Sequence, residues 1–151
     1  MSRNDSDPHR GAMLGALLRI AHSAMVEEYT RWLADSAYND IQPAHAAAIQ
    51  PLWQCPRGVR LTTLAQTARI TKQSMGALVD SLERGGYVER VEDPDDGRAS
   101  RIRLTARGRT FARDARAFAR EFESHLAGHI GERKLKELRS TLELVIDSLR
   151  N

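Results

Sequence analysis

Hydrophobic residues recur along much of the chain at steps of three and four, the spacing of helices with one apolar face. The first such stretch covers residues 12–36, and its stripe consists of Leu14, Leu18, Ala21, Met25, Tyr29 and Trp32. A second helix is predicted from Pro43, whose fixed φ suits the first helical position, to Trp53. Pro51 lacks a backbone N–H and crowds the carbonyl four residues earlier, so this helix should kink or stop there.

The sequence pattern of residues 61–105 predicts two short helices followed by a β-hairpin. Thr62 or Thr63 is the expected cap of the first helix, and Ile70-Thr71 forms the turn. Thr71 also caps the second helix, and one buried stripe is predicted there from Met75, Leu78, Val79 and Leu82. Gly85-Gly86 supplies a left-handed stop, and strands are expected over 87–92 and 101–104 around a loop at 93–98. Residues 59–61 can add a short third strand.

The C-terminal part predicts two further helices. Thr105 caps a long helix with an apolar stripe of Phe111, Ala115, Phe118, Phe122 and Leu126, which Gly128 and Gly131 should end. The last helix has a heptad seam, formed by Leu135, Leu138, Leu142, Val145 and Leu149. This seam and the first stripe exceed what one small core can bury, so the terminal helices are predicted to hold two copies of the chain together.

The predicted helix after Thr71 has an unusual polar face. Lys72, Gln73 and Ser74 occupy its first turn, and Gly76 lies in its interior, where glycine costs about 1 kcal/mol relative to alanine. Either the helix tolerates this cost at position 76, or a partner such as DNA approaches its backbone closely there. A surface helix facing water would look similar, but the wing that follows favours DNA. The fold class is therefore mainly α with a small β wing, a winged helix-turn-helix at residues 41–104.

Three segments carry a family resemblance: residues 82–90 (LERGGYVER), residues 96–98 (DGR) and residues 102–105 (IRLT) followed by Gly108. In order and spacing they resemble the MarR family of bacterial transcriptional regulators. The resemblance covers the whole chain as one domain, residues 1–151, with dimerisation helices at 12–36 and 105–151. It implies a homodimeric repressor that leaves a pseudo-palindromic double-stranded DNA operator when a small hydrophobic or aromatic effector binds.

The resemblance also implies DNA contacts. Gln73 and Ser74 would read base edges, Lys72 and Arg84 would contact phosphate, and Arg98 would enter the minor groove. Arg101 and Arg103 would follow the DNA backbone, and Asp96 would brace the guanidinium of Arg98. Apart from the resemblance, the spacing of four residues on a helix predicts that Arg84 holds Asp80 one turn away. The full expected DNA-binding set is Thr71, Lys72, Gln73, Ser74, Gly76, Ala77, Arg84, Asp96, Arg98, Arg101 and Arg103.

An effector site is implied where the terminal helices meet the winged helix. The residues expected there are His22, Met25, Tyr29, His45, Ile49 and Trp53. His22 and His45 are expected to face each other near Tyr29 as polar anchors in an apolar cleft. The same residues would also serve as ordinary core, so the chemical hint of an aromatic ligand is a weak one.

Composition sets the remaining bounds. With 151 residues, 41% hydrophobic and 28% charged, the chain is expected to be one globular domain in the cytoplasm. It has no run of 18 apolar residues that could span a membrane, and residues 1–10 have the composition of a disordered segment. Cys55 is the only cysteine, which excludes an internal disulfide.

The net charge of +3 is concentrated on the winged helix. Residues 1–56 carry 4 basic and 6 acidic side chains (−2), residues 57–109 carry 11 and 7 (+4), and residues 110–151 carry 8 and 7 (+1). A local excess of positive charge of this kind is expected of a surface that binds the phosphates of a nucleic acid.

Catalytic chemistry is not indicated. No phosphate loop, nucleophile elbow or apolar pair of carboxylates occurs, so an enzyme is not predicted and no cofactor is expected. His125 and His129 have a spacing that can hold a metal, but only Glu121 accompanies them, and a solvated or interface face is favoured. The alternative function that stays open is a winged-helix module that binds another protein and no specific DNA.

Overall fold

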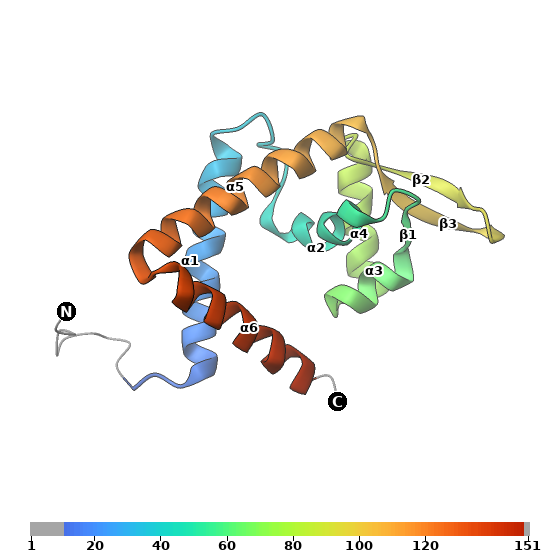
Figure 1. Cartoon of the computed structure of the whole chain (residues 1–151). Coiled ribbons are helices and arrows are strands. Elements are labelled where there is room, and N and C mark those ends of the chain that lie inside the picture. The colour runs from blue at the N-terminus through green and yellow to red at the C-terminus, as the bar shows by residue number, and fades with distance from the viewer. Residues whose placement is uncertain (1–10, 150–151) are drawn as a thin grey trace.

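The computed structural model describes residues 11–149, so the disorder expected for residues 1–10 lies outside the described part. Figure 1 shows a winged-helix lobe from which the long helix α5 extends toward α1, with α6 as an arm at the end of the chain. The long helices are α1 (Leu14–Ala34), α5 (Ala106–Ile130) and α6 (Glu132–Ser148). The lobe contains η1 (Pro43–His45), α2 (Ala46–Ile49), η2 (Gln50–Gln54), β1 (Val59–Arg60), α3 (Leu61–Ala68), α4 (Lys72–Arg84), β2 (Val88–Asp93) and β3 (Asp96–Leu104).

The recognition helix of the predicted motif, α4, begins and ends as expected. The Thr71 hydroxyl accepts a hydrogen bond from the Ser74 N–H at 3.0 Å, which satisfies one of the free donors of the first turn. At the other end Gly86 has φ +73°, and the N–H groups of Gly86 and Tyr87 donate to the carbonyls of Glu83 and Leu82. This paired pattern is a Schellman motif, and it turns the chain from the helix into β2.

The sheet has the order β1-β3-β2, which confirms the short third strand. The hairpin is longer than predicted, because β3 already begins at Asp96 and Asp93 pairs with it. The turn therefore contains only Pro94 and Asp95, and the expected loop at 93–98 is wrong. The reason is a buried carboxylate, Asp93, that ties the strand ends together and is described below.

The segment after Pro43 is broken as its prolines predict. Pro43 starts η1, the α-helical turns stop at Ile49, and Pro51 lies inside the tighter helix η2. The next helix, α3, starts at Leu61 directly after β1, with Arg60 in the cap position and no side-chain hydrogen bond. The expected caps Thr62 and Thr63 are therefore wrong, because the strand already delivers the chain in the extended conformation that a cap residue needs.

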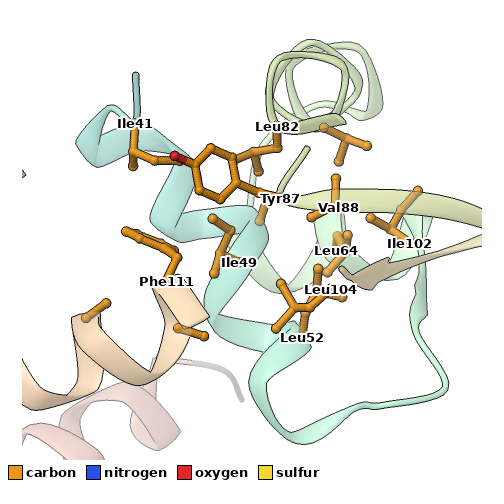
Figure 2. Close-up of a cluster of buried hydrophobic side chains, with 14 of the residues drawn as sticks. Ile41, Ile49, Leu52, Leu64, Leu82, Tyr87, Val88, Ile102, Leu104 and Phe111 are labelled. Carbon is orange, nitrogen blue, oxygen red and sulfur yellow. The ribbon is translucent and has the colours of Figure 1, made fainter. Parts of the chain in front are cut away.

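The core lies between α2, α3, α4 and the base of the hairpin, where α5 begins. Met75, Val79 and Leu82 of α4 are buried, as the stripe predicted. Figure 2 shows Tyr87 between Ile41, Leu82 and Phe111, with Leu52, Leu64 and Leu104 below it. Gly108 allows α5 to approach this core closely, since a Cβ added there would lie 1.9 Å from the carbonyl oxygen of Tyr87.

The two C-terminal helices differ from the prediction in one detail. Thr105 caps α5 by accepting from the Gly108 N–H, as expected, but the helix continues through Gly128 and ends at Gly131, whose φ is +89°. A helical glycine costs only about 1 kcal/mol, so Gly128 alone does not stop the helix. No residue of α6 is buried, and Leu33 is the only buried residue of α1.

Candidate nucleic-acid interface and effector cavity

The outer face of α4 presents the residues predicted to meet DNA. Lys72, Gln73, Ala77 and Arg84 are exposed on the side opposite the buried stripe, and none of these four side chains hydrogen-bonds or pairs with another residue in 11–149. Thr71 and Ser74 are also exposed, but their hydroxyls lie 2.8 Å apart and already bond to each other. Lys72 and Gln73 are therefore the donors at this end of the helix that are free to bind a partner.

Gly76 has no internal reason to be glycine. It is half-buried in the middle of α4, yet a Cβ added there would meet no atom within 4 Å. The helix thus bears the conformational cost of glycine without any close contact inside the chain.

Asp80, the acidic residue on the outer face of α4, is neutralised by a different arginine from the one expected. Asp80 pairs with Arg90 of β2 at 2.6 Å, and Arg90 also binds Glu83. The predicted pairing of Asp80 with Arg84 is wrong, because Arg90 reaches across from the neighbouring strand and binds both carboxylates. Arg84 is left exposed and unpaired within residues 11–149.

The wing is built around a buried aspartate that the sequence did not single out. The side chain of Asp93 is fully covered, the Arg60 Nε lies 2.5 Å from its Oδ2, and the Arg101 Nε lies 2.9 Å from its Oδ1. Burial acts to raise the pKa of Asp93, but the backbone N–H of Asp95 and the two guanidinium groups outweigh it and lower the pKa. The carboxylate therefore stays charged and holds β1, β2 and β3 together.

Three predicted wing contacts change as a result. Arg101 is only 19% exposed and binds Asp93 and Asp95, so its side chain is committed to the wing and is not free in the way that its predicted contact with the DNA backbone requires. Arg103 is exposed, but its Nε lies 2.7 Å from Glu89, which leaves it partly neutralised. Asp96 accepts the backbone N–H of Arg98 at 3.1 Å and lies 3.9 Å from Arg60, so it orders the turn and does not brace the Arg98 guanidinium. Arg98 itself is exposed near the wing tip.

A cavity of about 340 Å³ lies where α1 and α5 meet the winged helix, the place that the resemblance implied. It contains five of the six expected residues, His22, Met25, Tyr29, Ile49 and Trp53. Its other walls were missed: Val26, Pro43, Ala46, Gln50, Phe111, Ala115, Phe118, Ala119, Phe122 and Glu123. The stripe of Phe111, Ala115, Phe118 and Phe122 already marked that side of α5 as apolar, and this was the available signal.

The cavity is aromatic with few polar groups. Tyr29 stacks on Trp32 with ring centroids 5.6 Å apart, and Trp32 stacks on Phe118 at 5.1 Å. Burial raises the pKa of Tyr29 to about 12, so its hydroxyl remains a hydrogen-bond donor at neutral pH. Glu123 is held by Arg139 at 2.7 Å, which leaves His22, Tyr29 and Gln50 as the polar side chains available to a ligand.

His45 does not line the cavity, and that part of the prediction is wrong. It is 4% exposed, and its Nδ1 accepts a hydrogen bond from the Gln42 backbone N–H at 3.0 Å. Its role is to close the first turn of η1. His129 is likewise turned to its own helix, with Nδ1 2.8 Å from the His125 carbonyl. Within residues 11–149, no three His, Cys, Asp or Glu side chains cluster closely enough to hold a metal ion.

Comparison with known proteins identifies the family. The MarR family profile matches residues 56–99. The HTH-type transcriptional repressor Rv2887 of Mycobacterium tuberculosis is 30% identical over an alignment of 115 positions, which covers 68% of this chain and 83% of that protein. The chain belongs to the MarR family of transcriptional regulators. A second relative, the HTH-type transcriptional regulator BilQ of Clostridioides difficile, is 25% identical over 60% of this chain, and the matched part spans 62% of the length of BilQ.

Two solved structures of MarR-like regulators extend the comparison. The transcriptional repressor CouR bound to a 23-mer DNA duplex has a TM-score of 0.78 and 27% identity, with 96% of this chain and 99% of CouR covered. The M. tuberculosis MarR family protein Rv2887 in complex with salicylic acid has a TM-score of 0.67 and 28% identity, with coverage of 89% and 96%. Both confirm the winged-helix fold. None of the helices within residues 11–149 combines the length and apolarity that a membrane crossing needs.

Proposed function

We propose that this MarR-family protein is a homodimeric transcriptional repressor that binds a pseudo-palindromic operator and is released by a small aromatic or hydrophobic effector. The observation that carries DNA binding is the exposed first turn of α4, where Lys72 and Gln73 have no partner within residues 11–149. Arg98 is exposed near the tip of the wing that projects from the same lobe in Figure 1. CouR, which shares the fold, was solved on a DNA duplex.

The exposed apolar surface of the terminal helices supports the proposal of a dimer. On α1, Leu14 is 62% exposed and Leu18 is 38% exposed, while Leu138 of α6 is 46% exposed and Leu149, directly after α6, is 74% exposed. Leu135, Leu142 and Val145 of the predicted seam are half-buried against the rest of the chain. Leu144 and Ile146, which the seam did not include, are also exposed. Large apolar side chains exposed along two helices favour a partner, and a second copy of α1 and α6 provides a matching one.

The aromatic cavity supports the proposal that an effector binds this protein. The walls of the cavity come from α1 and α5 on one side and from the winged helix on the other, so a bound ligand would contact both. In a dimer, the position of the winged helix relative to α1 and α5 would set the spacing between the two α4 helices. The relative Rv2887 was solved with salicylic acid, a compound that is small, aromatic and anionic.

The DNA part is tested by binding to the region upstream of the protein's own gene, with scrambled DNA as control and several salt concentrations. Gln73→Ala should relax preference at one base pair per half-site, at a cost of about 1 to 3 kcal/mol, and keep the salt slope. Arg98→Ala should weaken binding to both DNAs and reduce the salt slope by about one. If neither DNA binds wild-type protein, the operator proposal is contradicted and the alternative of a protein-interaction module is favoured.

The effector part is tested by adding salicylate and related aromatic acids to the protein and to its operator complex. Salicylate should raise the melting temperature and release the DNA. Ala119→Trp should fill the cavity from its exposed rim, which removes the stabilisation by salicylate and leaves operator binding intact. If no aromatic acid stabilises wild type, or if Ala119→Trp responds like wild type, the cavity is not the effector site.

A further inference from the structure

A row of arginines follows one side of α5. Arg109, Arg113, Arg116 and Arg120 are spaced by four, three and four residues, so they share one face of the helix. With Trp53, Leu104 and Ala112 they line a second cavity, of about 330 Å³, that contains no acidic side chain. We call these seven residues the arginine groove.

The positive charge of the arginine groove is poorly compensated within residues 11–149. Only Arg113 has an ion pair, with the neighbouring Asp114 at 3.0 Å, and Arg109 donates to the Leu104 carbonyl. Arg116 and Arg120 form neither a salt bridge nor a hydrogen bond with a described residue. Like charges three and four residues apart on a helix repel one another, so the row destabilises α5 unless an anion binds it.

Trp53 supplies a second sign of an incomplete site. The Arg116 guanidinium lies 4.7 Å above the Trp53 ring, and the Trp53 indole N–H is buried without an acceptor among residues 11–149. A buried donor without a partner is uncommon, and the side chain that carries it is a wall of the arginine groove. Trp53 is also a wall of the aromatic cavity, so the two cavities share one side chain.

DNA is not the expected occupant of the arginine groove. In Figure 1 α5 starts beside the C-terminal end of α4, whereas Lys72 and Gln73 lie at the opposite end of that helix. With 13 residues, α4 separates the two ends by about 18 Å. From there α5 runs away from α4 and from the wing, toward α1.

We propose that the arginine groove binds a small molecule through two or more adjacent negative charges, as in a pyrophosphate group. A guanidinium presents two parallel N–H donors that match the oxygens of a phosphate, and several arginines in a row suit linked phosphates better than a single one. Because Trp53 is shared, an anion in the groove would alter the wall of the aromatic cavity. This site goes beyond the repressor proposal and does not depend on DNA binding.

Calorimetric titration of the full chain with inorganic pyrophosphate tests the proposal, with orthophosphate for comparison. Wild type should bind pyrophosphate more tightly than orthophosphate. The double variant Arg113→Gln/Arg116→Gln should bind pyrophosphate at least about tenfold more weakly. The matched control is Arg133→Gln/Lys134→Gln, which removes the same charge from exposed positions on α6 and should bind like wild type.

Several results would overturn this assignment. No pyrophosphate binding by wild type at millimolar concentration excludes the site, and equal weakening in both double variants shows a general effect of charge. If Arg113→Gln/Arg116→Gln lowers the salt slope of operator binding, the arginine groove is a DNA surface. If that variant changes the oligomeric state, a second copy of the chain covers the groove. Circular dichroism of each variant confirms that the comparison is between folded proteins.

Discussion

Single glycines illustrate how the same residue type can be required by internal packing or by a binding partner. A Cβ at Gly108 would come within 1.9 Å of the Tyr87 carbonyl oxygen, a backbone atom that cannot move without shifting β2. A Cβ at Gly76 would meet nothing within 4 Å. From the sequence alone Gly108 was only part of a family resemblance, whereas its contact with Tyr87 explains why the position must be glycine.

We therefore expect opposite effects from alanine at these two positions. Gly108→Ala should destabilise the fold by about 1 to 3 kcal/mol, because the close approach of α5 to the core is lost. Gly76→Ala should stabilise the fold by about 0.5 to 1 kcal/mol and still weaken operator binding, because in the proposed complex its methyl group would stand between α4 and the DNA. Urea unfolding and operator titration of both variants measure this. If Gly76→Ala binds operator as well as wild type does, the backbone of α4 does not approach the DNA closely.

At the scale of elements, local signals predicted the fold and long-range pairs escaped prediction. Thr71, Thr105 and Pro51 act through their own backbone neighbours, so their effects could be read from the sequence. Asp93 and Arg60 are 33 positions apart, and their pairing depends on the register of three strands. The same holds for Arg90, which takes the partner expected for Arg84. Charge partners in the wing were therefore the least predictable part of the site.

The short helix η1 should make stability depend on pH through His45. Burial lowers the pKa of His45 below its usual value of 6.5, opposed by the charge of Asp40. The unfolded chain then binds a proton at a pH where the folded chain does not, so stability is fully present above about pH 6.5 and declines as the pH falls below it, by at most about 1.4 kcal/mol per pH unit. Protonation of Nδ1 would also remove the acceptor for the Gln42 N–H.

His45→Gln keeps an acceptor at this position and removes the titration. The melting temperature of wild type should fall relative to that of His45→Gln between about pH 7 and pH 5, while the difference should be constant above pH 7. His22→Gln is the control, because His22 is exposed on α1. A constant difference between wild type and His45→Gln over the whole range would show that the histidine is not held neutral by the fold.

At the scale of the molecule, the winged helix is closed by its own core and the terminal helices are not. The buried residues lie mainly in α2, α3, α4, the hairpin base and the start of α5, while α6 contributes none within residues 11–149. The heptad pattern of α6 predicted from the sequence that apolar side chains of this helix would stay outside the core. Leu144 and Ile146 show that the exposed apolar surface is wider than the seam. The position of a second copy depends on contacts between chains, which the pattern of one chain does not specify.

We expect operator affinity to depend on this surface even though it is remote from α4. Leu138→Glu with Leu149→Glu places charges on side chains that are 46% and 74% exposed in the single chain, so the protomer should remain folded. Separated protomers lose the advantage of binding two half-sites at once, which can reach about 100-fold or more. Sedimentation velocity should show monomers, and operator titration should show the corresponding loss, with affinity for a single half-site unchanged.

The matched control is Ser140→Glu with Ser148→Glu, which adds the same charge to exposed positions of α6 outside the seam. It should leave both the oligomeric state and operator binding as in wild type. If both double variants dissociate equally, charge repulsion and not the apolar seam controls assembly. If wild type is already monomeric at micromolar concentration and binds operator tightly, one winged helix suffices, and the exposed leucines of α6 must serve another partner.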